Sequence, residues 1–321
     1  MKTVTHTDSS KEINLKIVIT GAAGYIGSKL TQRLLNYGHE LFCFDNFFFG
    51  QRKLVSRIFD HPKCHLFDDG VLMWPDELKE AIDRADVVYP LAALVGAPLC
   101  DKYPLLTQAL NSNWQGQLVE RLTNQIVVYC NSNSAYGTCP GICTEETPMN
   151  PLSLYATTKM EGEAHVHSYR RSVCFRLATV FGASPRPRTD LLVNNLAGQT
   201  HIDVFDGQFR RNYIHIDDVV SALEMPLARI DDMKGEIYNL GNDSINMTKE
   251  ELVKKICAVT GATWSIVGDR TDPDKRDYEV SSQKLYNLGY RCTRSLEHGV
   301  SEMMSLYKTL NEEDQPLCKN Y

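Results

Sequence analysis

The chain has 321 residues, of which 43% are hydrophobic and 23% are charged, and its formal net charge is −6 at pH 7. A chain of this length and composition can bury one large core or two modest ones. The net negative charge and the absence of a long Lys/Arg run argue against a nucleic-acid-binding surface. No apolar stretch reaches the roughly 18 residues needed to span a bilayer, and the polar start of the chain lacks a signal-peptide pattern. We therefore expect a cytoplasmic protein without membrane or nucleic-acid partners.

Cysteine usage supports a reducing compartment. The 10 cysteines are scattered, and several fall inside predicted strands (Cys43, Cys130 and Cys174), as is typical of buried thiols. Cys139 and Cys143 are four positions apart on a Pro/Gly turn, without a matching Cys or His pair. We therefore expect no metal site.

The first predicted element is an apolar strand over residues 16–20 that runs straight into a glycine loop and an amphipathic helix. The loop glycines are Gly21, Gly24 and Gly27. Glycines let bare backbone approach a diphosphate, while the N-terminus of the following helix directs unpaired N–H groups and its positive dipole end at the charge. This pattern predicts a dinucleotide-binding loop.

The second predicted strand, residues 41–44, ends at Asp45, which lies 18 residues after Gly27. A carboxylate at this position can accept both ribose hydroxyls of an adenosine and would repel a 2′-phosphate. We therefore predict NAD(H) rather than NADP(H) as the cofactor.

Further strands are predicted at residues 86–91, 125–130 and 173–176, with a helix over 105–122. Continuous hydrophobic runs, rather than strict alternation, favour parallel strands covered on both faces. We predict an α/β fold with a Rossmann-type doubly wound sheet over residues 15–180, after a flexible tail at 1–14. Residues 181–321 are expected to form mainly a smaller α+β substrate-binding lobe, with some segments returning to the sheet.

A second group of residues indicates acid–base chemistry. Tyr155 and Lys159 share one face of a predicted helix. A neighbouring ammonium favours phenolate and lowers a tyrosine pKa from about 10 toward neutrality, so Tyr155 is a candidate general base. Ser132 follows the strand at 125–130, and the carboxyl ends of strands face the ligand crevice in open α/β sheets. We expect the Ser132 hydroxyl to bind a substrate oxygen beside Tyr155.

In their order and combination, these motifs resemble the extended short-chain dehydrogenase/reductase family, and within it the NAD-dependent epimerases and dehydratases that act on nucleotide sugars. The matching segments are residues 20–27, 45–46, 91–93, 113–116, 132–137, 155–159, 176–182 and 211–218. The resemblance implies that Tyr155 takes the sugar hydroxyl proton and that Ser132 holds that oxygen. It further implies that Lys159 binds the nicotinamide ribose and tunes Tyr155.

The resemblance also implies two sets of contacts. The cofactor contacts are Gly21, Gly24, Tyr25, Ile26, Gly27, Asp45, Asn46, Leu91, Ala92, Ala93, Asn113, Tyr155 and Lys159, with Asp69 or Asp68 at the adenine. The substrate contacts are Asn133, Ser134, Thr179, Asn194 and Asn195, with Arg211 and Arg276 on the nucleotide diphosphate. Arg186 and Arg188 are compatible either with a diphosphate contact or with a solvated loop.

Departures from the wider family narrow the chemistry. In that family, 4,6-dehydratases carry Glu at the position of Ser134, and 3,5-epimerases carry Cys there. Asn133 and Ser134 do not titrate near pH 7, so a reaction that eliminates water from the sugar would lack its general acid. Oxidation and reduction at a carbinol remain, which leaves a C4-epimerase or a 4-dehydrogenase that produces a keto sugar.

A closer likeness favours the dehydrogenase. Residues 91–100, 131–137, 175–182, 190–194, 209–215 and 272–278 resemble the bacterial GDP-heptose 4-dehydrogenases of surface-polysaccharide pathways, and Thr179 fits that subgroup. The likeness implies a GDP-linked sugar, tightly held NAD, and a homodimer or higher homo-oligomer built on the helices near 105–122 and 155–169. The alternatives are a nucleotide-sugar 4-epimerase and a non-catalytic NAD-binding sensor.

Overall fold

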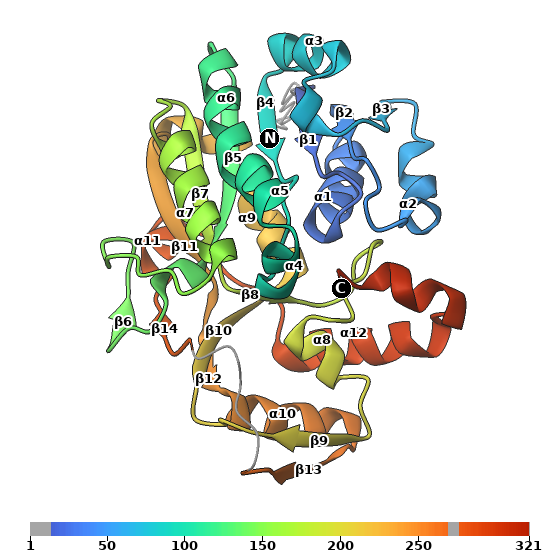
Figure 1. The fold of residues 1–321 in the computed structure, drawn as a ribbon, viewed down its shortest axis with the longest axis vertical. Helices are drawn as coiled ribbons and strands as arrows, with labels where there is room; N and C mark the ends of the chain where they lie inside the picture. The colour runs from blue at the N-terminus through green and yellow to red at the C-terminus, as the bar shows by residue number, and fades with distance from the viewer. Residues whose placement is uncertain (1–13, 269–275, 321) are drawn as a thin grey trace, which may run out of the picture.

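The computed structural model describes residues 14–268 and 276–320, so the predicted tail lies outside them except for Asn14. A seven-stranded sheet forms the centre of the larger lobe, in the order β11-β7-β5-β4-β1-β2-β3 (Figure 1). All six strand pairings are parallel. The strands are β1 (Lys16–Thr20), β2 (Glu40–Phe44), β3 (Cys64–Phe67), β4 (Val87–Pro90), β5 (Ile126–Ser132), β7 (Ser172–Leu177) and β11 (Glu236–Leu240). The predicted Rossmann-type fold is confirmed.

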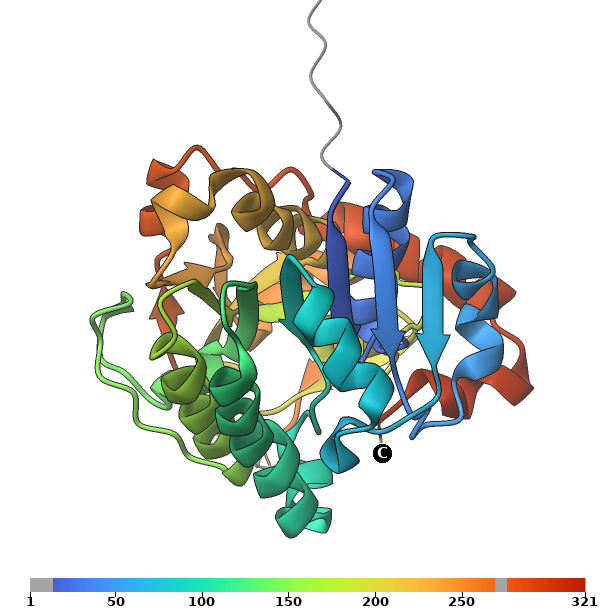
Figure 2. The same cartoon turned by 90° about the horizontal axis from the view of Figure 1, so that it is seen from above.

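The strands are apolar on both faces because helices cover both sides of the sheet. In β1, Ile17 and Ile19 belong to one buried cluster and Val18 to another on the opposite face. The first cluster includes side chains of α1 (Tyr25–Asn36) and α9 (Ile216–Met233). The second includes side chains of α3 (Asp76–Arg84), α6 (Trp114–Arg121) and α7 (Leu154–His167). Figure 2 shows the sheet between these two helical layers.

Smaller helices complete the larger lobe near the ends of the strands. They are α2 (Arg52–Phe59), α4 (Ala97–Lys102), α5 (Pro104–Gln108), the short 3₁₀ helices η1 (Val71–Met73) and η3 (Asn133–Tyr136), and the π-helical turn η2 (Ala109–Asn113). Within the described ranges, none of the helices combines the length and the apolar character that crossing a bilayer requires.

The second lobe lies in the lower half of Figure 1 and has its own core. Its strands are β8 (Thr179–Phe181), β10 (Arg210–His215) and β12 (Asn242–Thr248) in one sheet, and β9 (His201–Val204) with β13 (Thr263–Ile266) in another. Its helices are α8 (Leu192–Leu196), α10 (Lys249–Thr260), α12 (Leu296–Thr309) and η4 (Glu312–Cys318). Some later elements return to the first lobe: α9 packs on the large sheet and β11 joins it. The strand β14 (Glu279–Val280) pairs with β6 (Ile142–Cys143), and α11 (Gln283–Asn287) follows β14 in the chain.

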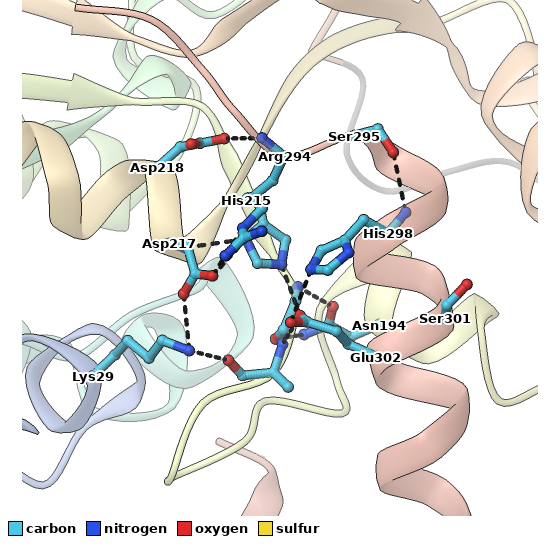
Figure 3. A network of polar contacts seen from close by, with 12 residues as sticks. Lys29, Asn194, His215, Asp217, Asp218, Arg294, Ser295, His298, Ser301 and Glu302 are labelled. Atoms are coloured by element: carbon cyan, nitrogen blue, oxygen red, sulfur yellow. Dashed lines mark hydrogen bonds and ion pairs between the residues drawn. The ribbon is translucent and has the colours of Figure 1, made fainter.

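A polar network ties the two lobes together around His215 (Figure 3). His215 ends β10 and caps α9, because its Nδ1 accepts the backbone N–H of Asp217 at 3.1 Å. Nε2 therefore carries the ring proton and donates to Glu302 of α12 at 2.8 Å. The other Glu302 oxygen lies 3.2 Å from His298, and Lys29 of α1 forms an ion pair with Asp217 at 2.8 Å. The side chains of His215, His298 and Glu302 thus meet as hydrogen-bond partners that join α9 to α12.

Candidate active site

The glycine loop lies at the carboxyl edge of the sheet, where β1, β2 and β4 end. Gly21 has φ +70°, donates its N–H to the Phe44 carbonyl at 2.8 Å, and would place a Cβ only 2.7 Å from the Ala92 nitrogen. A Cβ on Gly27 would lie 2.1 Å from the Gly21 carbonyl oxygen. These two glycines are therefore required by the close packing of the loop itself.

The start of α1 suits an anion. Gly24 is its N-cap and provides no side-chain cap, and residues 25–28 of the first turn include no acidic group. The first-turn N–H groups of Tyr25 and Ile26 are therefore available to a diphosphate, and the positive end of the helix dipole faces it. This donor set fits a dinucleotide.

Asp45 is fixed at the end of β2 by N–H donors. Its Oδ2 accepts the Ala23 N–H at 2.9 Å, and its Oδ1 accepts the Phe47 N–H at 2.8 Å and the Gln51 side chain at 3.3 Å. Burial raises the pKa of Asp45, and these hydrogen bonds oppose the rise. Each oxygen retains lone-pair capacity, so the oriented carboxylate fits the two ribose hydroxyls of an adenosine.

A chain of hydrogen bonds links Tyr155 to an arginine of the second lobe. Tyr155 lies in the first turn of α7, which begins where the Ser153 hydroxyl accepts the Ala156 N–H at 3.2 Å. The phenol shares a hydrogen bond with Ser132 at the end of β5. The Ser132 hydroxyl donates to the Ser134 hydroxyl at 2.9 Å, and Arg276 Nη1 donates to Ser134 in turn. The structure thus brings together the predicted Ser132 and Tyr155.

Burial dominates the titration of both Tyr155 and Lys159. Tyr155 packs against the cluster of Leu94, Leu99 and Cys100, and burial raises its pKa to about 12 despite the Ser132 hydrogen bond and the Arg276 charge. Burial also lowers the pKa of Lys159 to about 8. The expectation that the Lys159 ammonium brings the Tyr155 pKa toward neutrality is therefore wrong for the chain by itself. Desolvation penalises the charged form of each group and is the largest influence on both pKa values.

A buried ion pair joins the elements that carry Ser132 and Tyr155. Arg176 of β7 donates to Glu163 of α7 through Nη2 at 2.8 Å and Nε at 3.1 Å. Glu163 also accepts the Asn131 amide of β5 at 2.7 Å, and Arg176 donates to the Tyr136 hydroxyl of η3 at 2.9 Å. Sequence reasoning did not assign this network, although a charged residue within an apolar strand such as Arg176 signals a buried partner.

Comparison with known proteins agrees with this geometry. Residues 17–241 match the family model described as the NAD dependent epimerase/dehydratase family. The chain belongs to this family. The cofactor of the family is NAD, and NAD fits the donor set of the glycine loop and Asp45.

Individual relatives act on nucleotide sugars according to their names. The chain is 29% identical over 93% of its length to all of UDP-glucose 4-epimerase from Mycolicibacterium smegmatis. It is 28% identical over 71% of its length to 77% of the uncharacterized UDP-glucose epimerase YtcB from Bacillus subtilis. Among solved structures, UDP-glucuronic acid 4-epimerase from Bacillus cereus, in complex with UDP-glucuronic acid and NAD, has a TM-score of 0.77 and 25% identity, covering 92% of this chain and 100% of that one.

Several side chains predicted to contact ligands also form hydrogen bonds within the protein. The Tyr25 hydroxyl is buried and donates to the Gly182 carbonyl at 2.8 Å, so only its backbone N–H faces the cofactor site. Asn194 accepts the Gly182 N–H at 2.9 Å and donates to the Arg188 carbonyl at 3.0 Å, while Asn195 is exposed and accepts from Gln199. The amide groups of Asn194 and Asn195 thus brace the loop after β8 and the surface of α8, and their contact with the sugar stays a prediction.

Asn113, which is predicted to contact the cofactor, lies in the π-helical turn η2. Its side chain is exposed and accepts from Gln108 at 3.5 Å. The buried amide on this helix is Asn111, which donates to the Leu94 carbonyl at 2.8 Å and to the Thr158 hydroxyl at 3.4 Å. The π-helical turn η2 shifts the helical register here, and such turns are frequent at functional sites. A straight helical pattern does not reveal that shift.

The residues predicted to lie near the adenine are exposed. Asp68 forms an ion pair with Arg52, whose guanidinium lies 5.0 Å from the Phe47 ring centroid. Asp69 and Asn46 are exposed at the same edge. Leu91, Ala92 and Ala93 follow β4, with the Ala92 N–H donating to the Thr20 hydroxyl at 3.3 Å.

The predicted substrate side contains an unusual amide. Asn133 is completely buried in η3, and neither of its amide atoms has a hydrogen-bond partner among the described residues. An unsatisfied buried amide costs free energy, so it is suited to a polar ligand group. Thr179 begins β8 at intermediate exposure, and the Arg211 guanidinium of β10 lies 5.4 Å from the Tyr278 ring centroid.

Proposed function

We propose that this chain is an NAD-dependent nucleotide-sugar 4-epimerase. The observation that carries the proposal is the hydrogen bond between Tyr155 and Ser132 at the carboxyl edge of the sheet, next to a loop without a second acid–base group. Residues 132–136 are Ser, Asn, Ser, Ala and Tyr, and they contain neither a carboxylate nor a thiol. This set supports proton transfer at one carbinol.

In the proposed reaction, Tyr155 exchanges a proton with the hydroxyl at C4 of the sugar, and Ser132 holds that oxygen. The chemistry that NAD supplies when bound is reversible hydride transfer at the same carbon. Burial, the Ser132 hydrogen bond and the Arg276 charge act on the pKa of Tyr155, and Lys159 would hold the nicotinamide ribose. A 4-epimerase must present both faces of the oxidised carbon to the cofactor, and the epimerases named among the relatives support this outcome.

Recognition of the nucleotide portion is assigned to the second lobe. Arg211 lies on β10 with its guanidinium over Tyr278, and Arg276 already contacts the catalytic loop through Ser134. Guanidinium groups bind phosphates with two parallel hydrogen bonds, which suits a nucleotide diphosphate. The Asn133 amide would then bind a sugar substituent next to Ser132.

A 4-dehydrogenase acting on a GDP-linked heptose is the second candidate. Thr179 supports this candidate, because it fits the likeness to the GDP-heptose 4-dehydrogenases. Thr179 is the first residue of β8. The two candidates share the residues that take the proton of the C4 hydroxyl, and they differ in whether the keto sugar is released.

The test is to incubate the purified enzyme with UDP-glucose, UDP-glucuronic acid and GDP-mannose and to identify products by mass spectrometry and NMR. An epimerase yields a product of unchanged mass and inverted C4 configuration. A dehydrogenase yields a product lighter by two hydrogens, with accumulation of NADH. Tyr155→Phe serves as the control, and wild-type protein that binds these sugars without converting any of them would contradict the epimerase proposal.

A further inference from the structure

Arg186 extends from the second lobe into the cofactor-binding lobe. Its backbone N–H donates to the Ser28 hydroxyl of α1 at 3.2 Å. Its guanidinium carbon lies 4.9 Å from the ring centroid of Phe49, in the loop between β2 and α2. The side chain is 2% exposed, which rules out a solvated loop at this position. Arg186 therefore lies between the start of α1 and the end of β2.

The charge of Arg186 is poorly compensated. Its neighbour Arg188 makes two hydrogen bonds to Asp190, at 2.6 and 2.7 Å. Arg186 instead donates through Nη2 to the Lys319 backbone carbonyl at 2.8 Å, and its buried Nε has no partner among the described residues. Burial lowers the pKa of Arg186 to about 10, and the Arg188 charge adds to this effect. A buried cation without a hydrogen-bonded counter-ion is costly, so the site is built for an anion.

We propose that Arg186 binds the diphosphate of NAD from the second lobe. The proposal rests on the glycine loop being the dinucleotide site, as in the proposed function. The uncapped first turn of α1 supplies backbone donors on one side of that diphosphate, and Arg186 supplies a cation beside it. Asp45, which is to bind the adenosine ribose, lies near enough to interact with the Arg186 charge. The cofactor is thus held by both lobes.

Residues 312–320 hold the guanidinium in this position. The Lys319 carbonyl accepts from Arg186, and the Cys318 carbonyl accepts the Thr189 N–H at 2.8 Å. At the other end of this segment, Asp314 forms an ion pair with Lys53 of α2 at 2.5 Å. The segment therefore connects the loop that carries Arg186 with the helix that follows Asp45, and NAD binding is coupled to the contact between lobes.

The experiment compares cofactor-stripped wild type with Arg186→Met, Arg186→Lys and the control Arg57→Met, an exposed arginine of α2. Calorimetric titration uses NAD, ADP, adenosine and UDP as ligands. Arg186→Met should weaken NAD and ADP by about 10- to 100-fold, because one charge-assisted phosphate contact is lost. Adenosine and UDP affinities should be unchanged, Arg186→Lys should recover part of the loss, and Arg57→Met should match wild type.

The same variants also separate a binding role from a structural one. Without cofactor, Arg186→Met should unfold at the same temperature as wild type or higher, since a poorly compensated buried charge has been removed, and NAD should stabilise it less. A variant that melts earlier without cofactor but retains wild-type ADP affinity would overturn the proposal. So would equal weakening of adenosine and ADP. Activity on sugars is a separate measurement, so the proposed function can fail while this result stands.

Discussion

The Nζ atom of Lys159 lies 4.1 Å from the centroid of the Tyr129 ring, in a buried space between α7 and β5. The aromatic face offers the ammonium only partial compensation for lost water. Burial consequently lowers the pKa of Lys159 to about 8. The residue expected to tune Tyr155 is therefore held at a cost to stability, as is common for functional residues.

The first prediction concerns that cost. The folded pKa of Lys159 lies below the unfolded value of about 10.4. The free-energy cost of burying the charged ammonium therefore applies in full below pH 8 and fades as the pH rises toward the unfolded value. Lys159→Met should therefore stabilise the cofactor-free chain at pH 7 by on the order of 1–3 kcal/mol, and the gain should shrink by pH 10. Urea unfolding at both pH values measures it, and a less stable variant at pH 7 would contradict the assignment.

The second prediction treats Tyr155 and Lys159 as one catalytic unit. Tyr155→Phe should reduce turnover by roughly 10²–10⁴-fold with folding and NAD binding nearly intact, and Lys159→Met should reduce it comparably and also weaken NAD. The double variant should be little worse than either single variant. The rate of the wild type should rise with pH through an apparent pKa below the value of about 12 that burial gives Tyr155 in the cofactor-free chain. That step should vanish in Tyr155→Phe. Single variants within a few-fold of wild type would instead revive the sensor hypothesis.

Cofactor choice is the third prediction. The Asp45 carboxylate is held by two backbone N–H groups and would face the 2′-phosphate of NADP as an unpaired like charge. NAD should bind at least ten-fold more tightly than NADP, since such juxtapositions cost on the order of 1–3 kcal/mol. Titration with both dinucleotides measures the ratio, and Asp45→Asn should reduce it. Equal affinities in the wild type would remove this role from Asp45.

The fourth prediction follows from Ser134. Its hydroxyl accepts from Arg276 and does not titrate near pH 7, so the loop lacks an acid for loss of water. The enzyme should form no 4-keto-6-deoxy product from UDP-, GDP- or dTDP-hexoses. Mass spectrometry would detect such a product as a species lighter than the substrate by one water, and its appearance would show that another residue supplies the acid.

The fifth prediction concerns the buried pair of Arg176 and Glu163, whose side chains are 5% and 2% exposed. Glu163→Met should destabilise the protein by about 3–5 kcal/mol, because it leaves the Arg176 guanidinium buried without its counter-ion. The double variant Glu163→Met/Arg176→Met should recover much of that loss. Denaturant titration of the three proteins tests this, and strictly additive losses would show that the two groups act independently.

Local patterns were sufficient for the frame of this protein. The apolar run of β1 predicted a strand covered on both faces, and the structure has it. The glycine loop and Asp45 predicted a dinucleotide site, and the loop and the carboxylate lie at the same edge of the sheet. The placement of Tyr155 and Lys159 on one helix also follows from helical periodicity. These features are set within one or two elements, where backbone geometry dictates which residues share a face.

The tertiary structure alone decided which of the polar residues meet and how they titrate. Asn194 became a brace for Gly182 and Arg188, and Arg186 became a buried cation on α1, because the loop after β8 folds back onto the first lobe. Burial raised the pKa of Tyr155, although the i, i+4 spacing alone predicted a decrease. Contacts between residues distant in the chain, and the loss of water that accompanies them, depend on how the elements pack. Sequence periodicity therefore predicts the position of a side chain on its element, and only packing determines its partners and its charge.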